Sequence, residues 1–147
     1  MKPKYFLFYF FILILLFIIS CVQKEKIEIK QTGVVNMKLT SSAFVNNGGI
    51  PSEYTCDGSD VSPQLIISDV PKNAKSLALV MDDPDAPVGT WDHWVVFNIH
   101  PTTKQIAKST EPEGVAGKNS WGRTGYGGPC PPSGTHRYFF KLYALDT

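Results

Sequence analysis

Neither an excess of charge nor a long helical repeat marks this sequence of 147 residues. Its 14 basic residues nearly balance its 13 acidic ones, so we expect no basic patch for nucleic acid and no nucleic-acid partner. No window of about a dozen residues repeats its apolar positions with the period of an α-helix, and internal repeats are missing as well. Helix should therefore amount to a turn or two at most.

Common hydrolase motifs are missing too. The sequence has no Gly-x-Ser-x-Gly elbow and no His-Glu-x-x-His zinc motif. Its histidines and aspartates show no spacing typical of metal ligands. A thiol nucleophile at Cys130, with His136 as base and Asp83 to orient it, can be drawn, but Cys130 lies between two prolines with no helix N-terminus to activate it. We expect no catalytic residues, no metal and no cofactor, and a hydrolase is the weakest function hypothesis.

The longest apolar run, residues 5–19, is shorter than the about 20 residues that a membrane-spanning helix needs. Two lysines precede it, and its last two residues begin the sequence IISC at 18–21, an order that resembles a bacterial signal peptide with a lipobox. We predict a lipoprotein-type signal peptide at 1–20, lipid on Cys21, and a solvated tether at 21–36. An uncleaved signal anchor is the alternative. The prediction implies export and a lipid anchor in a membrane of the cell envelope.

Two cysteines remain once Cys21 is assigned to lipid. An oxidising compartment allows Cys56 and Cys130 to form a disulfide, but the sequence does not show whether they lie close enough. Both can equally be small buried apolar side chains. The pairing stays open.

Residues 37–147 have the pattern of one all-β domain. Runs rich in Val, Ile, Leu and aromatics, separated by Gly, Pro, Asn and Asp, predict strands at 37–44, 64–67, 76–82, 93–99 and 137–145. The segment 101–132 is rich in Gly and Pro and should be mostly loop. An antiparallel β-sandwich of the Greek-key type with long loops fits this pattern best.

Two Gly/Pro-rich motifs, each associated with a histidine, suggest a polar pocket. The first is DPDAP at 83–87 with His93 downstream, and the second is GYGGPCPPSGTHRY at 125–138, which contains His136. Strand alternation groups His93 with residues 91, 95, 97 and 99, and His136 with residues 138, 140, 142 and 144. Each histidine is then the last residue in a row of mainly apolar side chains. This position suits the mouth of a pocket whose floor is formed by core residues.

These groups suit a phosphate or a carboxylate. Histidine, aspartate and tyrosine side chains would meet there, and backbone N–H groups at 125–128 would complete a concavity for an anion. In the structural alternative, the histidines are satisfied core residues and the aspartates cap a turn. The candidate ligand-binding residues are Asp83, Asp85, His93, Gly128, Pro129, Pro131, His136 and Tyr138.

The motifs closely resemble those of the phosphatidylethanolamine-binding protein family, in particular its bacterial Raf kinase inhibitor-like branch. The resemblance rests on DDPDAP at 82–87, WDHWVVFN at 91–98 and the long motif at 125–138, with YTCDG at 54–58 and SP at 62–63 in support. It implies a β-sandwich with one anion pocket at its edge. Asp83, His93, His136 and Tyr138 would line this pocket, and residues 129–132 would form one wall.

The same resemblance bounds the function. Eukaryotic relatives bind phospholipid head groups or phosphorylated partners and inhibit kinases or proteases, whereas the bacterial branch has no settled reaction. We predict a lipid-anchored, non-catalytic binding protein for a small anion; the alternative is an inhibitor of a protease or kinase-type partner. Relatives continue with a helix and a closing strand, so we also expect a domain that is incomplete at its C-terminal end and less stable than a full-length relative.

Overall fold

Antiparallel strands and their connecting loops make up nearly all of residues 36–147, the part of the chain that the computed structural model describes. The predicted signal peptide, Cys21 and nearly all of the predicted tether lie outside the described residues. The elements in chain order are β1 (Lys38–Ser41), the 3-10 turn η1 (Ser52–Tyr54), β2 (Leu65–Ser68), β3 (Ser76–Asp83), β4 (Trp91–Ile99), β5 (Gln105–Ile106), β6 (Val115–Ala116) and β7 (Phe139–Leu145).

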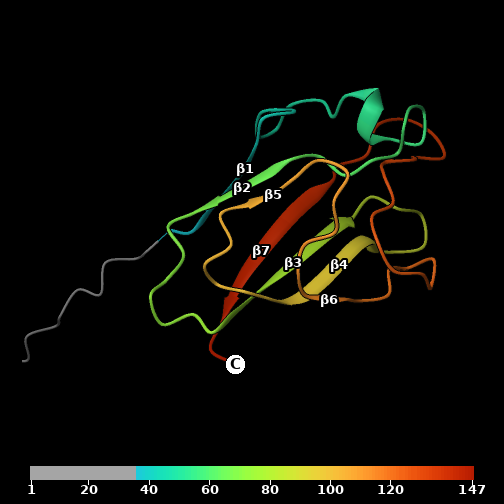
Figure 1. Cartoon of the computed structure of the whole chain (residues 1–147). Helices are drawn as coiled ribbons and strands as arrows, with labels where there is room; N and C mark the ends of the chain where they lie inside the picture. Colours follow the sequence, from blue (N-terminus) through green and yellow to red (C-terminus); the bar gives the residue numbers. More distant parts are fainter. Residues whose placement is uncertain (1–35) are drawn as a thin grey trace, which may run out of the picture. The chain divides into compact units, whose positions relative to one another are not determined.

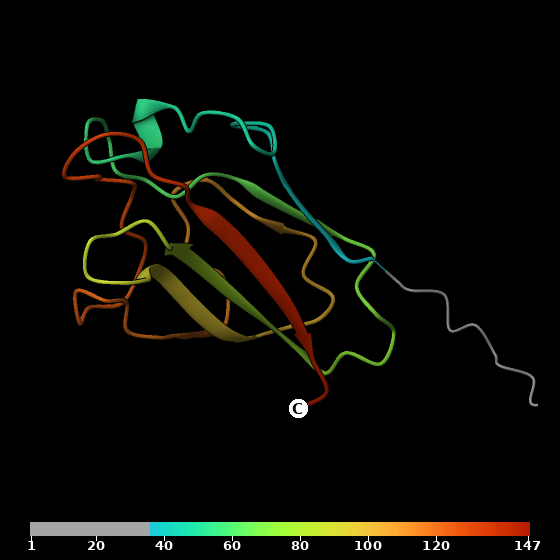
Figure 2. The same cartoon turned by 180° about the vertical axis from the view of Figure 1, so that it is seen from behind.

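The strands form two sheets, which the two opposite views show as separate layers (Figures 1 and 2). One sheet has the order β1-β2-β5 and the other the order β6-β4-β3-β7, and every pairing is antiparallel. The expected all-β sandwich is therefore confirmed. Each predicted strand overlaps an observed one, but β1 is shorter than predicted, and β5 and β6 lie within the segment that we expected to be loop.

Apolar side chains from both sheets form a single core between the layers. The three-stranded sheet contributes Leu65, Ile67 and Ile106, and the four-stranded sheet contributes residues that are fully buried: Leu77, Leu79, Met81, Trp94, Val96 and Ile99. Burying a side chain of this size stabilises the fold by roughly 1.5–3 kcal/mol. This core holds the ends of β3, β4 and β7 in place, where the candidate site lies.

A β-bulge at the start of β4 brings His93 into the interior. Met81 of β3 pairs with Trp94, but the next residue, Asp82, pairs with Asp92, so His93 is an extra residue in its strand. An extra residue re-aims the side chains around it. His93 and Trp94 are consequently both buried, although simple alternation assigns them to opposite faces.

A second irregularity in β4 corrects the predicted face of this strand. The extra residue here lies between Val96 and Ile99, and Asn98 has a positive φ of 56°. As a result Val96 and Ile99 both face the core, while Phe97 and Asn98 are both exposed. The prediction that His93, Val95, Phe97 and Ile99 form one apolar row is therefore wrong. Each of the two bulges shifts the alternation of inward and outward side chains by one residue.

In β7 simple alternation holds. Tyr138, Phe140, Leu142 and Ala144 all pack against the core, as the sequence predicts. The strand begins at Phe139, so Tyr138 and His136 belong to the segment that leads into it. Within residues 36–147 no helix has the length and apolar character that a bilayer crossing requires.

Candidate functional site

Sheet register gathers the candidate residues at one end of the four-stranded sheet. β3 ends at Asp83, which pairs with Trp91 at the start of β4. The preceding residue, Asp82, pairs with Phe139 at the start of β7. Asp83, the bulge at His93 and the segment before β7 are therefore neighbours in space although they are far apart in sequence.

His136 and Asp83 form a direct contact. His136 Nδ1 lies 2.7 Å from Asp83 Oδ2, and their side chains are only 10% and 5% exposed. The second carboxylate oxygen, Oδ1, accepts the backbone N–H of Asp85 at 2.8 Å. Because Nδ1 donates to the carboxylate, the orientation of the ring is set and Nε2 remains for another partner.

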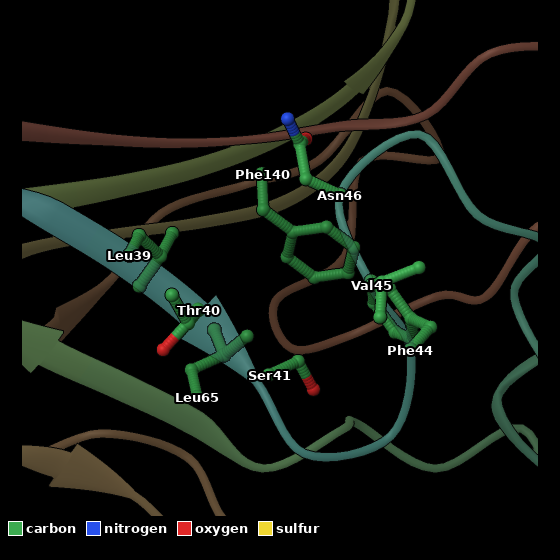
Figure 3. Close-up of a pocket in the computed structure, with 8 residues that line it drawn as sticks. All are labelled: Leu39, Thr40, Ser41, Phe44, Val45, Asn46, Leu65 and Phe140. Atoms are coloured by element: carbon green, nitrogen blue, oxygen red, sulfur yellow. The ribbon is translucent and has the colours of Figure 1, made fainter.

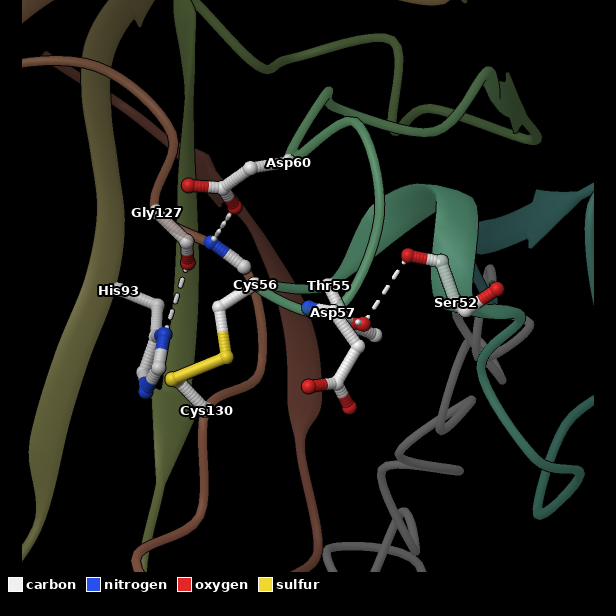
Figure 4. The surroundings of a disulfide bond; sticks show 9 residues. Ser52, Thr55, Cys56, Asp57, Asp60, His93, Gly127 and Cys130 are labelled. Atoms are coloured by element: carbon white, nitrogen blue, oxygen red, sulfur yellow. Dashed lines mark hydrogen bonds between the residues drawn. A yellow bond between two sulfur atoms is a disulfide. The ribbon is translucent and has the colours of Figure 1, made fainter.

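His93 is held by backbone instead of a carboxylate. Its Nδ1 lies 2.7 Å from the carbonyl oxygen of Gly127, which can only accept, so Nδ1 is the donor and Nε2 is again left over (Figure 4). The residue His93 is only 3% exposed. Its ring packs edge-to-face between the rings of Trp121 and Tyr138, with distances between ring centroids of 4.9 and 5.2 Å. The sequence predicts His93 and a backbone role for Gly127 through its N–H, whereas the contact with the Gly127 carbonyl and the packing of Trp121 are not predicted.

Tyr138 connects the two histidines. Its ring contacts His93 edge-to-face and is nearly parallel to the ring of His136 at 6.5 Å. Its hydroxyl oxygen is buried, and no described residue satisfies it with a hydrogen bond of normal geometry, although the Asp83 carboxylate and the backbone N–H of Cys130 lie near it. Burial, with a further contribution from the Asp83 carboxylate, raises the pKa of Tyr138 to about 12. The group is thus a neutral hydroxyl that an incoming acceptor would satisfy.

Asp85 has a different role from the one predicted. Its carboxylate accepts hydrogen bonds from the backbone N, Nε and Nη2 of Arg137 at 2.9, 2.9 and 2.6 Å. These hydrogen bonds hold the pKa of Asp85 well below its usual range. Asp85 therefore fastens the loop after β3 to the segment before β7, and Arg137 occupies both of its oxygens.

The backbone N–H groups of residues 127 and 128 also have a different role from the one predicted. The Gly128 N–H donates to Asp60 Oδ1 at 2.7 Å, and the Gly127 N–H donates to the carbonyl of His93 at 3.1 Å. The expectation that these N–H groups bind an anion is wrong, because both already have partners. Gly128 is needed for space instead, since a Cβ there would lie 2.5 Å from the carbonyl oxygen of Tyr54.

A disulfide joins Cys56 to Cys130, with their Cα atoms 5.4 Å apart (Figure 4). This is the pairing that the sequence left open, and both residues are exposed. The bond removes the thiol that the hydrolase hypothesis needed at Cys130, which corrects that hypothesis. Among residues 36–147 no group of three or more His, Cys, Asp or Glu side chains is arranged to hold a metal ion.

A cleft of about 680 Å³ opens at this end of the sandwich. Pro129, Pro131, His136 and Tyr138 line one side, and residues 44–50 line another. Asp83 and His93 do not line the cleft themselves, but they contact His136 and Tyr138, which do. The structure thus brings together most of the residues predicted for the pocket, with Asp85 and Gly128 as supporting parts.

A second, smaller cavity of about 240 Å³ lies beside this cleft (Figure 3). Leu39, Leu65 and Phe140 converge in it, and Phe44 borders both cavities. Its polar groups are uncharged, namely the side chains of Thr40, Ser41 and Asn46. It lacks a cationic or imidazole group for an anion, so the larger cleft is the better candidate.

Comparisons with known proteins agree with these observations. A family model described as phosphatidylethanolamine-binding protein matches residues 40–147. A UPF0098 protein of Methanothermobacter thermautotrophicus is 55% identical over 117 residues, which cover 76% of this chain and 78% of that protein. A UPF0098 protein of Aquifex aeolicus is 51% identical over 117 residues, covering 75% and 68%.

Solved structures show the same fold. The crystal structure of a phosphatidylethanolamine-binding protein homologue from Chlamydia trachomatis matches with a TM-score of 0.73 and 46% identity, over 76% of each chain. Escherichia coli YbcL, described as a new member of the mammalian family, matches with a TM-score of 0.70 and 35% identity, over 76% of this chain and 77% of that one.

Proposed function

Because the chain belongs to the phosphatidylethanolamine-binding protein family, we propose that it is a non-catalytic binding protein for a small anion, either phosphate or a phosphorylated head group. The observation that carries the proposal is the buried Tyr138 hydroxyl without a partner, next to His93 and His136. A phosphate oxygen would accept its hydrogen bond, and each imidazole has one ring nitrogen left to donate when protonated.

The absence of turnover is supported by the state of the candidate nucleophiles. Cys130 is engaged in a disulfide, and the raised pKa of Tyr138, about 12, keeps its oxygen protonated near neutral pH. A bound anion would therefore meet donors and no activated attacking group. We also propose that lipid on Cys21 anchors the domain to a membrane of the cell envelope, as the lipobox-like sequence suggests.

The test is a titration of the full-length chain with inorganic phosphate and, separately, with glycerol 3-phosphate, followed by ³¹P NMR. The double substitution His93→Ala and His136→Ala should weaken binding at least tenfold, because it removes both imidazole donors. His100→Ala is the matched control, since His100 is exposed and its side chain bonds only to nearby Thr102. Its affinity should match the wild type. Phosphate binding that survives the double substitution would overturn the proposal.

A second candidate function is inhibition of a protease or kinase-type partner that grips the loops of the pocket. One observation favours it: the rim of the cleft is open to a macromolecule, since Val45 is 76% exposed and residues 130–135 are all exposed. Capture of a specific protease or phosphorylated protein from the cell envelope, lost on Val45→Asp, would favour inhibition. A chain that binds phosphate but captures no such partner would favour the first function.

A further inference from the structure

We propose that the Cys56–Cys130 disulfide is a redox modification site that controls the affinity of the cleft for its anion. The proposal rests on the proposed function, because its consequence is a change in anion binding. It follows from how the Gly/Pro-rich segment 126–135, here called the wall because it supplies Pro129, Pro131, Gly134 and Thr135 to the lining of the cleft, is attached to the rest of the domain. The two halves of this wall are held by different kinds of bond.

The first half of the wall is anchored by hydrogen bonds to the segment around η1. The Tyr126 hydroxyl donates to the carbonyl of Tyr54 at 2.7 Å, and the Gly128 N–H donates to Asp60 at 2.7 Å. The backbone N–H of Cys56 donates to the carbonyl of Pro129 at 3.1 Å. None of these three contacts uses a sulfur atom, so each can persist when the disulfide is reduced.

The second half, residues 130–135, has no such anchors. All six residues are exposed, and within the described part of the chain their side chains form no hydrogen bond, while the backbone N–H of Cys130 lies near the Tyr138 hydroxyl and not near the η1 segment. The next fixed point is His136, through its contact with Asp83. Between Pro129 and His136 the disulfide is therefore the link that ties the wall to the facing segment of the domain.

Reduction would act directly on the cleft. Pro131, Gly134 and Thr135 belong to this half and line the cleft, and the same segment leads into His136. Freed residues sample more conformations, and binding must order them again at an entropic cost. We expect the affinity for phosphate to fall about tenfold, while the sandwich core, which lies between the sheets, keeps its packing.

The chemistry needs a dithiol reductant, either a small molecule or a protein. A thiolate of the reductant attacks one sulfur of the exposed disulfide and forms a mixed disulfide, and the other cysteine leaves as a thiolate. The second thiol of the reductant then displaces the remaining cysteine. Two electrons and two protons pass to Cys56 and Cys130, and the reductant becomes a disulfide. The exposure of both cysteines permits this attack in the folded protein.

The experiment treats the full-length chain with dithiothreitol under native conditions, traps the thiols with iodoacetamide, and measures phosphate affinity and far-UV circular dichroism. The proposal expects reduction without loss of the β-sheet spectrum and an affinity about tenfold weaker, restored when an untrapped sample is reoxidised. A bond that resists dithiothreitol in the native state, or an unchanged affinity after reduction, would overturn it. If the oxidised chain itself does not bind phosphate, the proposed function has failed, and this inference fails with it.

Two variants keep the test decisive if reduction unfolds the domain. Pro132→Gly loosens the second half of the wall while the disulfide stays intact, and it should weaken phosphate binding several-fold. Tyr126→Phe is the matched control, because it removes one anchor of the first half without freeing residues 130–135. Its affinity should change less than twofold. Equal affinities of Pro132→Gly and the wild type would contradict the proposal.

Discussion

The two halves of the cleft wall differ in what holds them, although they adjoin in sequence. Residues 126–129 are fixed by hydrogen bonds to Tyr54, Cys56 and Asp60, whereas residues 130–135 depend on one covalent bond. The first half is mostly buried and requires glycine for close approach, while the second is exposed throughout. The first half is thus packed into the domain, whereas the second is an exposed loop that the disulfide attaches to the rest of the domain.

The two histidines reflect the same difference. His93 is positioned by a bulge in β4 and by the carbonyl of Gly127, so its place depends on backbone. His136 follows the loosely attached half and is positioned by a side chain, the carboxylate of Asp83. We expect changes in the wall loop to disturb His136 more than His93. The following predictions test this contrast in order of expected effect.

The largest effect should come from the double substitution Cys56→Ser and Cys130→Ser. The two cysteines are 74 residues apart in sequence. In the chain-entropy model, removing a cross-link that closes a loop of this size lowers the free energy of unfolding by roughly 4 kcal/mol. Urea unfolding of the variant and of the reduced wild type should show the same loss. A loss below about 1 kcal/mol would mean that the bond adds little to the stability of the domain and would contradict the prediction.

A smaller effect on stability is expected from alanine substitutions of two glycines, one in each half of the wall. Gly128→Ala should destabilise the protein by about 2–3 kcal/mol, because the new Cβ would lie 2.5 Å from the carbonyl oxygen of Tyr54 and 2.9 Å from the Cα of Thr55. Gly134→Ala should lose only about 1 kcal/mol, from its positive φ of 70°. No atom lies within 4 Å of a Cβ at Gly134. Urea unfolding of both variants measures the difference, and equal losses would contradict the contrast.

The smallest effect should be a dependence on alkaline pH. In the unfolded chain a tyrosine ionises near pH 10, whereas burial and the Asp83 carboxylate raise the pKa of Tyr138 to about 12 in the fold. The proton is bound more tightly by the folded state, so stability is fully present below pH 10 and falls as the pH rises towards 12.

Thermal unfolding between pH 9 and 12 measures this effect, with Tyr138→Phe as the comparison. The substitution should flatten part of the decline. Some decline should remain, because burial also raises the pKa of Tyr126. Identical profiles for the wild type and Tyr138→Phe would show that the Tyr138 hydroxyl is open to water.

The general architecture could be predicted from the sequence because strand patterns and turn residues are local. The strands at 76–83 and 139–145 and the core-facing row of β7 follow from them. The two bulges could not be predicted, because aromatic residues such as Trp94 and Phe97 are compatible with either face. β5 and β6 are only two residues long, too short for a periodic signal.

The site was predictable in its residue types and less so in its contacts. Asp83, His93, His136 and Tyr138 stand next to rigid Gly/Pro motifs, which is a visible pattern. The groups that hold His93 and the neighbouring Gly128, namely the carbonyl of Gly127 and the carboxylate of Asp60, belong to segments that meet these residues only in the folded chain. The same holds for Asp85. Its position within the motif suggests a ligand-binding residue, whereas its bidentate contact with Arg137 gives it the structural role of connecting two segments.

A crystal structure of the chain soaked with inorganic phosphate would test the central claim most directly. The account predicts an anion within hydrogen-bond distance of the Tyr138 hydroxyl and of Nε2 of both His93 and His136, at the end of the cleft formed by Pro129 and Pro131. An empty site at saturating phosphate would contradict the account, as would an anion bound elsewhere or a Tyr138 hydroxyl bonded only to protein groups.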